Sequence, residues 1–292
     1  MEQFVYTNEG RVLLREANQD DISKIYEMYQ ATNPEDWWEE ENLSEFRFNL
    51  IKEAKGRIFI ALLKDEVIGH AEVVLPESKD DPVYLVRLNI HDDFGRRKFG
   101  IELVRYSAII MKNLGYKSYV TWPDTNKSKG LYKKVGLKEI KENPQMLLTI
   151  KDKKRTEVEV VKELKFNEEP ENLQLVVGCP WARDYIWLKA FKAGEEELLD
   201  YRGPYVHQIS FEGVEGVTLL DGNSVYIYLP EAEKDNIEMI EELLIYSSNL
   251  ALDNGIENLH INIKDELWSQ LDLSDIWEID KEEERLEMKM EF

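Results

Sequence analysis

The sequence predicts an α/β protein with a mixed sheet, built from two consecutive domains of the same type. The chain has 292 residues, more than a single hydrophobic core usually fills, which favours two domains. Short apolar runs of strand length alternate with segments of helical periodicity, as in α/β folds. One order of strand, helix and Gly stop occurs twice: Val83 and Gly115 are 32 positions apart, and Val225 and Gly255 are 30 positions apart.

The first half begins with a predicted strand over residues 11–15. Polar residues 18–21 can cap the helix that follows, and apolar side chains recur on one face of that helix. A second amphipathic stretch covers residues 43–51. Residues 58–63 and 67–75 are then expected to pair as an antiparallel hairpin that turns at Lys64-Asp65.

Residues 83–90 form a nearly continuous apolar run, which is typical of a central strand buried on both faces. Four further elements are expected in this half: a helix over 99–114 that stops at Gly115, a strand over 116–122, a short helix over 127–135, and a last hairpin over 137–150 that turns at Asn143-Pro144.

The second half repeats part of this order, with a strand at 225–229, a helix at 237–252 and a strand at 256–263. Duplication of one fold explains the repeat, although strand–helix–strand units recur in any α/β protein. A charged, Pro-containing segment over 151–172 marks the boundary, so we expect domains at 1–153 and 154–292. No clear prediction follows for residues 155–205.

Composition excludes several classes of protein. No segment approaches the roughly 20 apolar residues that span a bilayer, and the N-terminus lacks the pattern of a signal peptide, so a cytoplasmic protein without membrane contact is expected. The single Cys179 cannot form an internal disulfide, and none of the four His has ligand spacing, so no metal site is expected. A net charge of −22 argues against nucleic-acid binding.

The charge is unevenly distributed. Residues 1–150 carry 22 basic and 25 acidic side chains, whereas residues 151–292 carry 15 and 34. Within the first half, residues 94–141 hold 12 basic and 3 acidic side chains, a net charge of +9. A solvated helix face would explain this basic segment, and so would an anionic ligand.

The basic segment begins in a loop that could bind an anion. Asp92 to Gly100 separates a buried strand from a helix start, where free backbone N–H groups favour negative charge. Gly95 and Gly100 allow close backbone approach, and Arg96, Arg97 and Lys98 add positive charge. The loop resembles a cradle for pyrophosphate, although a capped surface loop has the same composition.

Two motifs together resemble the GNAT family of N-acetyltransferases. The run from Arg87 to Gly100 is similar to the family signature, whose loop is (Gln/Arg)-x-x-Gly-x-(Gly/Ala). Gly100 matches its last position, whereas Gly95 and Lys98 occupy the first and fourth. The second motif lies 32 residues after Arg96 and resembles Asn-x-x-(Ala/Ser)-x-x-Leu-Tyr-x-x-x-Gly-Phe, with Ser128, Leu131, Tyr132 and Gly136 in register.

The resemblance implies two tandem GNAT-like domains, with acetyl-coenzyme A as co-substrate of the first. Backbone of the central strand would pair with the pantetheine arm, and a strand bulge there would aim an N–H at the thioester oxygen. The residues expected to bind acetyl-coenzyme A are Leu88, Asn89, Ile90, Gly95, Arg96, Arg97, Lys98, Phe99, Gly100, Ile101, Asn126 and Ser128.

The resemblance also suggests catalytic residues for direct attack by an amine. Tyr132 is the candidate general acid for the leaving thiolate, with a role as a core aromatic as the alternative. Glu72 is the candidate base, and the alternative is that it is only a solvated carboxylate at a strand end. His70 and His91 are lesser candidates. The acceptor is expected to be an amine of a small molecule or peptide, held in part by the acidic and aromatic residues 33–41.

The second half lacks such a loop, because residues 230–235 place three acidic side chains where phosphates would bind. We therefore expect a degenerate, non-catalytic partner domain that shapes the acceptor cleft, in a monomer or homodimer. Two other classes remain open: a non-catalytic module that binds coenzyme A or another protein, and an acidic scaffold without a ligand.

Overall fold

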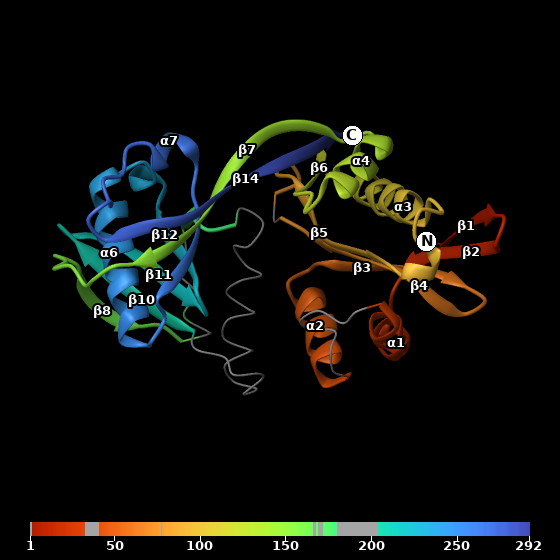
Figure 1. Cartoon of the computed structure of the whole chain (residues 1–292), viewed down its shortest axis with the longest axis horizontal. Helices are drawn as coiled ribbons and strands as arrows, with labels where there is room; N and C mark the ends of the chain where they lie inside the picture. The colour runs from red at the N-terminus through yellow and green to blue at the C-terminus, as the bar shows by residue number, and fades with distance from the viewer. Residues whose placement is uncertain (1, 33–40, 77, 166–167, 169–171, 180–203) are drawn as a thin grey trace. The chain divides into compact units, whose positions relative to one another are not determined.

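The computed structural model describes residues 2–32, 41–76, 78–165, 168, 172–179 and 204–292. The chain divides into two compact units (Figure 1). The first unit comprises Met1–Lys141 and Leu286–Phe292, and the second comprises Glu142–Arg285. Each unit combines a mixed sheet with helices, which confirms the predicted α/β class.

The first unit follows the predicted order of elements, with one additional N-terminal strand. Its strands are β1 (Glu2–Thr7), β2 (Gly10–Glu16), β3 (Arg57–Leu63), β4 (Glu66–Val74), β5 (Val83–Ile90) and β6 (Ser118–Thr121), and its helices are α1 (Ile22–Thr32), α2 (Glu41–Glu53), α3 (Phe99–Asn113) and α4 (Asn126–Val135). Strands β1 to β5 pair antiparallel in sequence order, and β5 pairs parallel with β6. The sequence pattern missed β1 because most of its side chains are exposed and show no apolar alternation.

Helices cover both faces of this sheet. In Figure 1, α1 and α2 lie on one face of β3–β5, and α3 and α4 lie on the other. Strands β3 and β4 are buried along almost their whole length. Burial on both faces explains why these strands are apolar runs instead of alternating sequences.

The turn between β3 and β4 confirms the expected hairpin. Lys64 and Asp65 both have positive φ, 51° and 73°. Two consecutive residues of positive φ form a type I′ turn, which fits the right-handed twist of the paired strands. This tight connection places Leu63 opposite Glu66 at the start of the hairpin.

The second unit repeats the same arrangement. Its elements are β8 (Glu159–Glu163), β9 (Leu173–Val177), β10 (Tyr205–Phe211), β11 (Val214–Asp221), β12 (Ser224–Pro230), α6 (Ile237–Asp253), β13 (Asn258–Asn262) and α7 (Asp265–Trp268). Strands β8, β10, β11 and β12 are antiparallel neighbours in that order, as β2 to β5 are, and β12 then pairs parallel with β13. The predicted repeat of strand, helix and strand is therefore confirmed.

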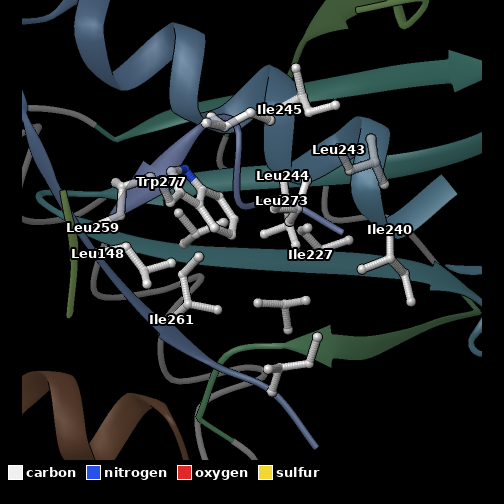
Figure 2. Packing of buried hydrophobic residues seen from close by; sticks show 14 of the residues in the cluster. Leu148, Ile227, Ile240, Leu243, Leu244, Ile245, Leu259, Ile261, Leu273 and Trp277 are labelled. Carbon is white, nitrogen blue, oxygen red and sulfur yellow. The ribbon is translucent and has the colours of Figure 1, made fainter. Parts of the chain in front are cut away.

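The second unit has a hydrophobic core of its own (Figure 2). Ile240, Leu243 and Leu244 of α6 are fully buried and belong to one cluster with Ile227 of β12. The Nε1 of Trp277 donates to the Oγ of Ser248 at 2.9 Å, which satisfies both polar groups inside this core.

Two long strands cross the unit boundary along the chain. Strand β7 (Lys138–Ile150) begins in the first unit, and its residues 145–149 pair with β13. Strand β14 (Trp277–Glu291) begins in the second unit, and its residues 288–291 pair with β6. The expected hairpin at Asn143-Pro144 is wrong, because β7 is continuous there.

The observed units therefore differ from the expected domains 1–153 and 154–292. The first unit ends at Lys141 and regains the last seven residues, Leu286–Phe292. The local sequence predicts that a strand forms, but it does not predict which strands it pairs with, because the pairing partners are distant along the chain. None of the described helices is long and apolar enough to cross a membrane.

Candidate acyl-coenzyme A site

The candidate site is a fork between two parallel strands. Strands β5 and β6 pair only over residues 83–85 and 119–121. The Oγ of Thr121 donates to the backbone O of Leu85 at 3.0 Å and closes the base of the fork. Beyond Leu85 the strands separate, so the β6-facing edge of β5 from Arg87 to Ile90 borders open space.

A bulge lies where the strands separate. The register between β4 and β5 shifts so that Glu72 is opposite Arg87, whereas the next residue, Val73, is opposite Leu85. Val86 is therefore the extra residue on β5. A bulge bends a strand and re-aims its backbone groups. It was expected at Leu88–Ile90 and lies two residues before them.

The fork opens into a pocket of about 900 Å³. Eleven of the twelve residues expected to bind acetyl-coenzyme A line it, and Arg97 is the exception. The lining also includes five cations, Arg87, Arg96, Lys98, Lys127 and Lys134, and two carboxylates, Asp92 and Asp124. The excess of positive charge favours an anionic ligand.

The loop from β5 to α3 has the geometry of an anion site. Arg96 and Lys98 adopt left-handed backbone conformations with φ of 64° and 70°. Such conformations cost a residue with a side chain about 1–2 kcal/mol, and they cluster at ligand sites. Lys98 is the N-cap of α3 and makes no side-chain cap, so the first N–H groups of this 15-residue helix remain available to a ligand.

Arg97 points away from this pocket. Its guanidinium lies 2.6 Å from the carboxylate of Glu9, which follows β1. The guanidinium also lies 5.4 Å from the ring centre of Phe94. Arg97 borders a smaller depression with Glu9 and Tyr6, whereas Arg96 and Lys98 border both this depression and the main pocket.

Helix α4 forms the opposite wall of the fork. Lys127, Gly130, Leu131 and Lys134 share one face at helical spacing, and all four line the pocket. The helix begins with a capping box in which the Oγ of Thr125 accepts from the N of Ser128, and the Oγ of Ser128 accepts from the N of Thr125. The hydroxyl of Ser128 therefore caps the helix through Thr125, and Ser128 also lines the pocket together with Asn126.

Tyr132 lies in the pocket wall with only 6% of its surface exposed. Burial raises the pKa of its phenol to about 12, and a hydrogen bond with Thr121 opposes this shift. The phenol is therefore protonated throughout the pH range in which most enzymes work. A protonated phenol beside the fork can donate to a leaving group that develops negative charge.

Glu72 does not line this pocket. Its side chain is fully buried on the sheet face covered by α1 and α2, and it accepts from the Nε of Arg47 at 3.0 Å. Burial opposes ionisation, but the charges of Arg47, Arg87 and His70 outweigh it and hold the pKa of Glu72 at about 2. A carboxylate that remains ionised and paired is poorly suited to accept a proton, so we do not assign it the role of base.

The two histidines are also engaged elsewhere. His70 is fully buried, its Nδ1 lies 3.0 Å from the hydroxyl of Tyr29, and burial lowers its pKa to about 4. The Nδ1 of His91 accepts from the N of Asp93 at 3.2 Å and caps a single 3₁₀ turn. The expected acceptor segment 33–41 lies outside the described residues except for Glu41.

Sequence reasoning missed part of the pocket wall. Thr121 and Trp122 line it from the end of β6, and the Nε1 of Trp122 donates to Glu287 of β14 at 3.2 Å. A signal was available, because the carboxyl ends of adjacent parallel strands meet at one edge of a sheet. Glu287 carries no such signal, since nothing in the local sequence places it beside β6.

Comparisons with known proteins agree with this geometry. Residues 22–137 match the model of the acetyltransferase (GNAT) family. No curated protein matches the sequence significantly. A candidate acetyltransferase from Pyrococcus horikoshii has a similar structure over 99% of this chain and 91% of that chain, with a TM-score of 0.60 and 15% identity.

Two smaller structures resemble part of the chain. The PaiA N-acetyltransferase of Thermoplasma acidophilum, in complex with coenzyme A, has 18% identity and a TM-score of 0.39, with 44% of this chain and 91% of that chain covered. The ribosomal-protein-S18-alanine N-acetyltransferase of Escherichia coli has 14% identity and a TM-score of 0.38, with 45% and 80% covered.

Residues 22–137 of the first unit match the GNAT family of acetyltransferases, and the second unit repeats the strand order of the first.

Proposed function

We propose that the first domain transfers an acetyl group from acetyl-coenzyme A to an amine of a small molecule or peptide. The observation that carries this proposal is the pocket itself. It joins the open edge of β5, the N-terminus of α3 without a side-chain cap, and an excess of cations. An extended arm that ends in phosphates matches these three features.

The backbone of Leu88 to Ile90 would pair with the pantetheine arm as an added strand does. Arg96 and Lys98, together with the first N–H groups of α3, would hold the pyrophosphate. Gly100 leaves room for two side chains of the pocket wall, because a Cβ there would lie 3.0 Å from Leu131 and 3.3 Å from Ile90. The pocket residues thus fit both the polar and the anionic parts of the ligand.

Tyr132 would then act as the general acid. The neutral amine attacks the thioester carbonyl carbon, the carbon–sulfur bond breaks, and its electron pair goes to sulfur. The phenol of Tyr132 gives its proton to this sulfur and regains one that the new amide nitrogen releases. The products are the N-acetylated acceptor and free coenzyme A thiol.

We assign no base among the three candidates, because Glu72 and His70 are buried and the Nδ1 of His91 caps a turn. We therefore expect the acceptor to react in its neutral form, so turnover should rise with pH up to the pKa of its amine. The same observation favours a second candidate function, a module that binds coenzyme A without catalysis.

Calorimetric titration of acetyl-coenzyme A into the full chain tests binding. Arg96→Glu should weaken binding at least tenfold, which is about 1.4 kcal/mol, because it reverses a charge in the pocket. Arg97→Glu is the matched control, because Arg97 is paired with Glu9 outside this pocket and exposed ion pairs contribute little. Equal loss in both variants, or no binding by the wild type, would contradict the assigned cradle.

Thiol release separates the two functions. The enzyme should release free thiol from acetyl-coenzyme A with at least one amine of a broad acceptor panel. A binding module should show the same calorimetric affinity and release none.

A further inference from the structure

The second unit contains a fork of the same kind as the first. Strand β12 occupies the place of β5, and it pairs with the parallel strand β13 only at Ser224 and His260. Beyond this point β12 and β13 do not pair with each other in the described register. By analogy with the first unit, the edge of β12 from Val225 onward would border an open pocket.

That edge is occupied by the chain itself. Strand β9 pairs antiparallel with β12, with Val177 opposite Ile227 and Leu173 opposite Pro230. The end of β9 also contacts the other arm of the fork, because the N of Gly178 donates to the backbone O of Asn262 at 2.7 Å. Segment 173–178 therefore contacts both strands that form the fork.

The fit at the base of the fork is close. Val177 is fully buried in the same hydrophobic cluster as Ile227. Gly178 has a φ of 128°, and a Cβ at this position would lie 2.4 Å from Cδ1 of Tyr226. Only glycine combines that backbone conformation with so close an approach.

We propose that β9 fills the strand-pairing site of the second domain, so that this domain cannot take up a pantetheine arm. The inference rests on the proposed function in one respect: the edge of β5 is taken as the site where that arm binds. Of the two forks in the described residues, the one in the first domain is then the site that remains open to acyl-coenzyme A. Segment 173–178 occupies the corresponding strand-pairing site of the second domain.

Two features of the following loop agree with this proposal. A short turn, Glu231–Glu233, follows β12 and presents acidic side chains where the first domain has Arg96 and Lys98. The N-terminus of α6 is capped, because the side chain of Asn236 accepts from the N of Met239 at 3.1 Å. In contrast to α3, this helix start has a side-chain cap, and the charge beside it repels phosphate.

Hydrogen exchange measured by mass spectrometry, with and without acetyl-coenzyme A, tests the proposal on the full chain. Peptides that cover 225–230 should exchange slowly without ligand and should not respond to it. Peptides that cover 88–90 should exchange faster without ligand and slow when it is added. Calorimetry should give one site per chain.

A variant of Gly178 tests whether β9 is the cause of slow hydrogen exchange at residues 225–230. Gly178→Val should displace β9 from Tyr226 and accelerate exchange at 225–230. Gly213→Val is the matched control, because Gly213 also has a positive φ, 82°, but a Cβ at this position would meet no atom within 4 Å. It should leave exchange at 225–230 unchanged.

The outcomes separate this proposal from the proposed function. Slowing of exchange at 225–230 by acetyl-coenzyme A, two sites per chain, or unchanged exchange in Gly178→Val would overturn the role of β9. Absence of any response at 88–90 would overturn acyl-coenzyme A binding by the first domain, while slow, Gly178-dependent exchange at 225–230 would still support the filled fork.

Discussion

Arg47 and Glu72 form an ion pair inside the first domain, between α2 and β4. The Nε of Arg47 lies 3.0 Å from Oε2 of Glu72, and a second guanidinium nitrogen contacts the same oxygen. Exposure is 7% for Arg47 and zero for Glu72. Two charges removed from water in this way depend on each other, because either one alone would be costly to bury.

Removing one partner should therefore destabilise the domain strongly. We expect Glu72→Gln to lower the free energy of unfolding by about 3–5 kcal/mol, because the charge of Arg47 remains buried without its counter-ion. The double variant Arg47→Met/Glu72→Leu should recover most of this loss, since both charges are gone. Urea denaturation at pH 7 measures both variants. A single variant as stable as the wild type would contradict the importance of the pair.

The stability of the domain should also fall in acid, first through His70. Burial lowers the pKa of His70 from 6.5 to about 4, so between these pH values the unfolded chain binds a proton that the folded chain does not. Stability should decrease as pH falls from 6.5 to 4, by an amount on the order of 3 kcal/mol. Urea titrations across this range measure the slope, and His70→Asn should flatten it.

Glu72 provides a second and separate window. Its pKa is lowered from 4.5 to about 2, so its contribution is complete above pH 4.5 and is lost as pH falls toward 2. His70→Asn should retain this loss, whereas Glu72→Gln should remove it and keep the loss between 6.5 and 4. An identical pH profile in both variants would show that the two groups do not titrate as described.

Much of the first domain could be predicted from sequence because its signals are local. The strand β5, the turn at Lys64-Asp65 and the stop at Gly115 each follow from neighbouring residues, and each is present. The expected burial of β5 on both faces is wrong, because most of this strand is only partly buried. The pairing of β7 with β13 and of β14 with β6 could not be predicted from the sequence. Whether residues 138–150 fold back as a hairpin or continue as one strand depends on partners more than 100 residues away.

The site divides in the same way. Eleven of the residues predicted from β5, the loop and the α4 motif line one pocket, because strand ends and helix starts meet there. The sequence could not show that Arg97 pairs with Glu9 or that Glu72 pairs with Arg47, because each pair joins distant segments. Charge type is visible in sequence, but the direction of a side chain depends on tertiary structure.

Lys98 offers a test of backbone strain in the loop between β5 and α3. It occupies the family's glycine position and retains a positive φ of 70°. Lys98→Gly and Lys98→Ala both remove the charge, but only glycine adopts this conformation without cost. We expect Lys98→Ala to be less stable than Lys98→Gly by about 1 kcal/mol. Equal unfolding free energies would mean that the loop relaxes without strain.

Both Lys98 variants should bind acetyl-coenzyme A more weakly than the wild type, and to a similar extent, because they lack the same charge. Calorimetry measures this together with the stability series. A glycine variant that binds as tightly as the wild type would show that backbone N–H groups, and not the lysine charge, dominate recognition.

Tyr132 and Tyr119 provide a matched pair for the chemical step. Both phenols are buried, with pKa values raised by burial, but Tyr132 lines the pocket whereas the hydroxyl of Tyr119 lies 2.7 Å from the Oγ of Ser107 outside it. Tyr132→Phe should lower kcat by a factor of about 10²–10⁴, the usual contribution of a general acid, and leave acetyl-coenzyme A affinity unchanged. Tyr119→Phe should leave kcat within about twofold of the wild type. Thiol release with an amine from the acceptor panel measures kcat, and calorimetry measures affinity. Full turnover in Tyr132→Phe would exclude the phenol as the acid, because phenylalanine keeps the ring and lacks the hydroxyl that would donate the proton.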